Sequence, residues 1–131
     1  MSENLIEDFS SDKKYFTIVP NIIFDFPMDV YCFRVYCHIK RVAGDSGTCW
    51  QSTRTIAKKC QISPSTVTRS IRKLANAGFI NLRVVPGKHG EFPHNEITIK
   101  DIWANNHFFF GLGDMEKKDL IFNWKGMMRN A

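Results

Sequence analysis

Side chains able to hold phosphate groups are concentrated between residues 52 and 77, a stretch with arginines, lysines and many hydroxyl groups but without aspartate or glutamate. Arginine and lysine neutralise phosphate oxygens, and serine and threonine donate hydrogen bonds to phosphates or to base edges. The residues of this stretch that we expect to contact phosphates are Ser52, Thr53, Arg54, Lys58, Lys59, Arg72 and Lys73. The chemistry that this composition favours is the binding of a polyanion.

The residue types needed to read bases occur in the same stretch. Short hydroxyl side chains come first and a long cation follows, in the set Ser63, Ser65, Thr66, Thr68 and Arg69. A helix that enters the major groove of DNA with its N-terminus foremost needs this order. A face exposed only to water would normally carry acidic residues as well.

The spacing of apolar residues predicts two short helices that position these side chains. Ser52 is a suitable N-cap for a helix over 53–60, and Ser63 for a helix over 64–77. The residues expected to face inward are Ile56, Ala57, Cys60, Val67, Ile71, Leu74 and Ala75. This spacing is that of a DNA-binding helix-turn-helix. An ordinary helical hairpin is the competing interpretation.

Two details of these helices bear on function. Gln61 stands in the turn where glycine is usual, at a position that often needs a positive φ. Arg54 lies in the first turn of its helix, where acids are normally preferred, and neither helix has an acid in its first turn. Helix beginnings of this kind are suited to phosphate.

The segments 79–85 and 96–102 alternate as two antiparallel strands, joined by a turn-rich loop at 86–93. We expect this loop to be a wing whose Lys88 and His89 contact phosphates, along the backbone or in the minor groove. A solvated loop without a ligand is the alternative, and the histidines are expected at the surface rather than on a metal.

The remaining elements complete a fold prediction. A largely apolar helix should start near Met28, with Asp25 as a possible cap, and end at Ala43, and residues 48–50 could form a very short strand. The order helix, helix, helix, hairpin is that of a winged helix. The expected fold class is mainly α with a small antiparallel β-hairpin (α+β), in a winged helix-turn-helix domain over 15–106 with a C-terminal amphipathic helix.

The two ends are expected to differ from this domain. Residues 1–14 should be flexible, and 15–26 should form an edge strand or an extended arm, because Pro20 interrupts it. A tail at 107–131 should contain a helix over about 114–128. Its apolar face, expected to contact a second copy of the chain or a replication or transcription protein, consists of Leu120, Ile121, Trp124, Met127 and Met128. A plain core role is the alternative.

Charge and composition narrow the function further. The net charge is +5, but residues 30–100 alone carry twelve Lys or Arg and three Asp or Glu. Acids are too sparse there for acid–base pairs or magnesium sites, so we expect no enzyme and no cofactor. The four cysteines lack metal-site spacing and are expected to be free thiols. With no signal peptide and no apolar run of membrane length, we expect a cytoplasmic protein without membrane contact.

Residues 15–106 resemble the winged-helix domains of phage and mobile-element replication proteins of the replisome-organiser type. The resemblance lies in YFTIVPNII, a helix ending IKRVAG, CWQSTRTIAKKC, ISPSTVTRSIRKLANAGFI, and NEITIKDIW followed by Asn105. It implies binding of double-stranded DNA through the helix at 64–77, in replication initiation or transcription regulation. A homodimer is expected on the DNA. A winged helix that binds protein instead of DNA is the alternative.

Overall fold

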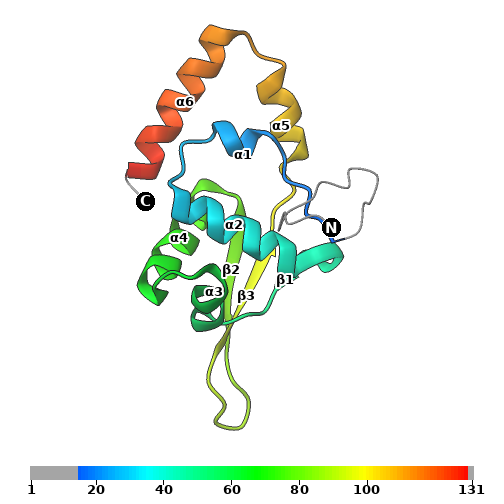
Figure 1. The fold of residues 1–131 in the computed structure, drawn as a ribbon, viewed down its shortest axis with the longest axis vertical. Coiled ribbons are helices and arrows are strands. Elements are labelled where there is room, and N and C mark those ends of the chain that lie inside the picture. The colour runs from blue at the N-terminus through cyan, green and yellow to red at the C-terminus, as the bar shows by residue number, and fades with distance from the viewer. Residues whose placement is uncertain (1–14, 130–131) are drawn as a thin grey trace, which may run out of the picture.

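The computed structural model describes the backbone from Tyr15 to Arg129 and the side chains as far as Gly126. The segment 1–14, expected to be flexible, lies outside the described residues. The chain forms six α-helices and three strands in this range (Figure 1). In chain order the elements are α1 (Ile22–Asp25), α2 (Val30–Ala43), a short 3-10 helix (Gly44–Ser46), β1 (Thr48–Cys49), α3 (Thr53–Cys60), α4 (Pro64–Ala77), β2 (Ile80–Val85), β3 (His94–Ile99), α5 (Trp103–Phe110) and α6 (Asp114–Arg129).

The three strands form one antiparallel sheet in the order β1-β3-β2. The β2–β3 hairpin extends away from the helices and ends in the loop at 86–93 (Figure 1). The predicted fold class is confirmed: the chain is mainly helical, with a small antiparallel sheet and a C-terminal helix. The strand bounds differ from the prediction, because β2 begins at Ile80 and β3 spans His94–Ile99 instead of 96–102.

The core lies where α2, α3 and α4 pack against one another and against the base of the hairpin. Val35, Tyr36 and Ile39 of α2 are fully buried in it. Side chains buried around them come from the other elements: Ile56, Val67, Leu74, Ile80 and Ile97. Each such aliphatic side chain contributes about 1.5–3 kcal/mol when it leaves water, so this cluster fixes how the three helices cross.

Helix α2 begins two residues later than the sequence suggested, and with a different cap. Asp29 is the N-cap, and its Oδ1 accepts a hydrogen bond from the backbone N–H of Cys32 at 2.8 Å. Asp25, the expected cap, is instead the last residue of α1. Asp29 also accepts a hydrogen bond from Nζ of Lys73 at 3.2 Å, which ties the start of α2 to α4.

The segment 15–26 does not form the edge strand that was one of the two interpretations. Residues 16–20 are an extended arm outside the sheet, and α1 follows with Ile22 and Ile23 buried. The N–H of Ile22 donates to Oδ1 of Asn106 in α5 at 2.8 Å. Ile22 and Ile23 of this segment are therefore buried in the core instead of pairing in a strand, whereas Ile18 remains exposed.

The C-terminal helices belong to the same body as the rest. Helix α5 runs across the expected boundary between residues 106 and 107 and packs against α1, and α6 packs against α4 (Figure 1). Trp124 stacks 5.1 Å from the ring of Phe26 and 5.4 Å from that of Phe109.

The apolar face of α6 therefore serves the core of its own chain. Leu120, Ile121 and Trp124 all pack against the buried cluster, which makes the core alternative correct for these three. The side chains of Met127 and Met128 lie outside the described residues. No helix between Tyr15 and Arg129 is both long and apolar enough to cross a membrane.

The cap at Asp29 makes a testable contribution to stability. Asp29→Ala should lower the free energy of unfolding by about 1 kcal/mol, the usual cost of losing an N-cap. Burial tends to raise the pKa of Asp29, but the hydrogen bonds from Cys32 and Lys73 outweigh it and hold this pKa below the ordinary 3.8. The difference between wild type and variant should therefore be complete above pH 3.8 and shrink as the pH falls below it.

Urea denaturation at several pH values measures this difference, with Asp45→Ala as the control. Asp45 is also exposed but makes no side-chain hydrogen bond to another described residue. An effect of Asp29→Ala no larger than that of the control would contradict the capping role.

Candidate nucleic-acid interface

Helices α3 and α4 have the bounds that the sequence predicted, because serine caps define both starts. Oγ of Ser52 accepts a hydrogen bond from the N–H of Thr55 at 3.1 Å, and Oγ of Ser63 from the N–H of Thr66 at 3.2 Å. Neither helix has an acidic residue in its first turn. Both positive helix ends are therefore free of carboxylates from their own helices, as anion binding requires.

The turn between the helices has the conformation that the sequence left in question. Gln61 is left-handed, with φ 61° and ψ 43°, so a side chain other than glycine occupies the strained position. The N–H of Ile62 donates to the carbonyl of Ala57 at 3.1 Å and closes the turn. This geometry sets the angle at which α4 leaves α3.

One row of side chains runs along the outer surface of α4. Ser65, Arg69, Arg72 and Asn76 are spaced four, three and four residues apart, which places them within about 60° of the helix circumference. All four are exposed. We call them the outer row of α4. Its arginines form no ion pair with a described residue, so their guanidinium groups are available to a ligand.

Lys73 does not belong to this row. Its ammonium group lies 3.2 Å from Oδ2 of Asp29, on the side of α4 that faces the start of α2. The sequence could not indicate this pairing, because the two residues are 44 positions apart. Lys73 is thus paired with an acid of its own chain, unlike the arginines of the outer row.

The hydroxyl groups at the start of α4 are mostly occupied with one another. Oγ of Ser63 lies 3.1 Å from Oγ of Ser65 and 2.8 Å from Oγ1 of Thr66. Thr68 donates to the carbonyl of Pro64 at 3.1 Å. Ser63 therefore acts first as a cap that positions its neighbours, while the exposed Ser65 and Thr68 keep free acceptor capacity.

A groove of about 500 Å³ separates α4 from the hairpin. Arg72, Thr68 and Thr53 line it together with three asparagines: Asn76, Asn81 and Asn95. Nδ2 of Asn95 donates to Oγ1 of Thr53 at 3.3 Å and joins the hairpin to the start of α3. The groove thus brings the start of α3, the outer side of α4 and the strands of the hairpin to one surface.

Sequence reasoning missed Asn81 and Asn95 as members of this surface. Asparagine is depleted in strands, so its presence in β2 and β3 was an available signal for a role other than strand formation. Each offers an amide that both donates and accepts, which suits sugar and phosphate oxygens.

The loop at 86–93 has the predicted extent and holds Lys88 and His89 exposed at its tip. The N–H of Glu91 donates to the carbonyl of Lys88 at 3.0 Å, which closes a tight turn through the left-handed residues His89 and Gly90. Within the strands of the hairpin, Nε of Arg83 donates to Oε2 of Glu96 at 2.6 Å. Arg83 is thus paired with an acid of its own chain, whereas Lys88 at the tip forms no ion pair with a described residue.

A family model described as a helix-turn-helix domain matches residues 31–80. Residues 31–80 are a helix-turn-helix domain. The match covers α2, α3, α4 and the first residue of β2, so the domain includes the two capped helix starts and the outer row of α4. Such a domain suggests DNA binding and is typically not enzymatic. A search of curated proteins found none that matches the chain.

The strained turn of the helix-turn-helix domain gives a direct test of its geometry. Gln61→Gly should raise the free energy of unfolding by about 0.5–1 kcal/mol, because glycine adopts a positive φ without steric cost but loses more entropy on folding. Gln61→Val should lower it, because a β-branched residue resists this conformation more strongly. Thermal and urea denaturation measure both. A glycine variant less stable than wild type would contradict the left-handed turn.

Proposed function

We propose that this protein binds double-stranded DNA through α4 and the elements beside it. The observation that carries the proposal is the acid-free surface made by the starts of α3 and α4, where Arg54, Arg69 and Arg72 are exposed without an ion-pair partner among the described residues. A surface that only faced water would gain nothing from excluding acids, whereas contact with phosphates requires it.

In this proposal α4 lies in the major groove with its N-terminal half toward the bases. Ser65, Thr68 and Arg69 approach base edges, with Ser63 and Thr66 holding the start of the helix in place. The residues that contact the sugar-phosphate backbone come from α3, α4 and the wing: Ser52, Thr53, Arg54, Lys58, Arg72, Lys88 and His89. The wing lies along the backbone or in the minor groove, depending on how far the duplex bends toward it.

The biological role that we propose is replication initiation of the phage or plasmid type, or transcription regulation. The resemblance of residues 15–106 to replisome-organiser domains supports the first role, and the wide use of this domain in regulators supports the second. Double-stranded DNA is the partner in both. The homodimer and the partner protein expected at α6 lose their main support, because Leu120, Ile121 and Trp124 are engaged in the core.

Protein binding by the helix-turn-helix domain is the competing function. It would use the same surface but would favour a mixture of charges and exposed apolar groups over arginines without acids. The dependence of affinity on salt separates the two, since contact with several phosphates makes DNA binding weaken steeply as salt rises.

Arg69 is expected to help the protein discriminate between DNA sequences. Duplexes selected from a random pool provide a cognate sequence, against which a random duplex is compared. Arg69→Ala should cost about 1–3 kcal/mol on the cognate duplex and much less on the random one, because a base contact is lost. Fluorescence anisotropy at fixed salt measures both. Equal losses on the two duplexes would remove Arg69 from the base-reading residues.

Lys58 is expected to contact the phosphate backbone of any duplex. Lys58→Ala should weaken cognate and random duplexes alike, and should reduce the slope of log affinity against log salt by about 1. Lys118→Ala is the matched control, because Lys118 is an exposed lysine on α6, away from the proposed surface. An unchanged slope for Lys58→Ala, or the same change in both variants, would contradict the proposed contact.

A further inference from the structure

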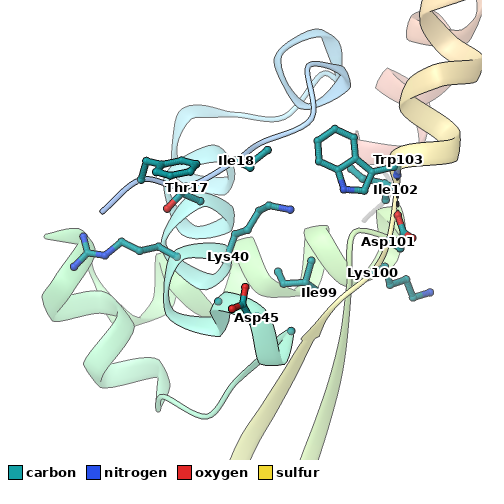
Figure 2. A pocket seen from close by; sticks show the side chains of 13 residues that line it. Thr17, Ile18, Lys40, Asp45, Ile99, Lys100, Asp101, Ile102 and Trp103 are labelled. Carbon is teal, nitrogen blue, oxygen red and sulfur yellow. Dashed lines mark hydrogen bonds between the residues drawn. The ribbon is translucent and has the colours of Figure 1, made fainter. Parts of the chain in front are cut away.

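Two hollows flank the extended arm at residues 16–20, and they differ in charge. The larger, of about 610 Å³, contains Lys40, Lys100 and Arg41 but also Asp45 and Asp101 (Figure 2). Lys40 extends toward Trp103 there, with Nζ 5.9 Å from the ring centroid. This hollow supplies much of its own counter-charge, so nothing in it calls for an anion.

The smaller hollow, of about 340 Å³, is lined by three cations and no acid. Arg34 and Arg41 are seven residues apart on α2, so they lie on one face of that helix, and Lys59 reaches the hollow from α3. Thr17 of the arm adds a hydroxyl group. We call this hollow the α2–α3 pocket.

The α2–α3 pocket lies apart from the outer row of α4. Lys58 is four residues after Arg54 and therefore shares its side of α3, whereas Lys59 is turned by about 100° from Lys58. Lys59 lines the α2–α3 pocket, and Lys58 does not. The basic surface that looked continuous in the sequence is thus divided along α3 into two.

The cations of the pocket form no ion pair with a described residue, although Arg41 also borders the larger hollow that contains Asp45 and Asp101. Neither of the ion pairs within the described part of the chain includes Arg34, Arg41 or Lys59. Like charges around one hollow repel each other, and a bound anion would relieve that repulsion.

The positive field also reaches the walls of the pocket. Burial raises the pKa of the Cys37 thiol, which lines the pocket, and the charges of Arg34 and Lys40 oppose this rise. The buried His38 closes the pocket, with Nε2 held 2.8 Å from Oε1 of Gln51. This hydrogen bond holds the His38 ring in place in the wall of the pocket.

We propose that the α2–α3 pocket binds a phosphate group, as an anion site separate from the surface of α4. The phosphate belongs either to the backbone of a duplex that continues past the segment read by α4, or to a free polyphosphate such as that of a nucleotide. Both sources present the same oxygens to Arg34, Arg41 and Lys59. The duplex source rests on the proposed function, whereas the free source does not.

The test compares the double variant R34Q/R41Q with the control K100Q/K118Q, which removes the same charge from exposed lysines elsewhere. One arm measures affinity for a duplex limited to the footprint of α4 and for one extended by about one helical turn at each end. The other arm titrates inorganic tripolyphosphate into the protein without DNA, by calorimetry. Thermal unfolding checks that each variant is folded, and K59Q replaces the double variant if R34Q/R41Q is not.

If the phosphate belongs to the DNA backbone, wild type and control should bind the extended duplex about tenfold more tightly than the short one. The R34Q/R41Q variant should lose this advantage. If the site takes a free polyphosphate, wild type and the control should bind tripolyphosphate, and R34Q/R41Q should not. This result should hold even if no duplex binds to the protein. The proposal is overturned if R34Q/R41Q matches wild type in both arms, or if the control loses as much as the double variant.

Discussion

The crossing of α3 and α4 is the constraint on which the rest of the structure depends. A left-handed residue at Gln61 and the small, buried Ala57 let the two helices meet closely, and the serine caps fix where each begins. Once this crossing is set, the outer row of α4 points away from the core, and all four of its side chains are exposed. The sheet and α2 hold the crossing from behind through Val35, Ile39 and Ile97.

The central elements could be predicted from sequence because local signals and burial agree there. Ser52 and Ser63 each precede an amphipathic stretch, and the structure places both helices at the predicted bounds. The need for a positive φ at Gln61 also followed from the pattern of the turn. In the wing, the turn residues between Val85 and His94 predicted the bounds of the loop correctly. The bounds of the strands were predicted less well, because the alternation of residues continues past those that pair.

Other features depend on contacts between distant parts of the chain, and the sequence could not indicate them. Lys73 has the residue type of a phosphate ligand, but its partner Asp29 comes from the start of another helix. The segment 15–26 has the composition of a strand, yet the amide of Asn106 satisfies the start of a helix there. Helix geometry turns Lys59 away from Lys58, but the packing of α2 against α3 is what places Arg34 and Arg41 beside Lys59.

In the proposed complex, the carboxylate-free starts of α3 and α4 contact the phosphate backbone of the DNA. The most direct measurement is an NMR titration of the labelled chain with a short duplex, following backbone amide shifts at low and raised salt. We expect the largest changes at residues 52–54 and 63–66, little change along α6, and a loss of these changes as salt rises. Changes confined to α5 and α6, or changes at the helix starts that do not respond to salt, would contradict this contact.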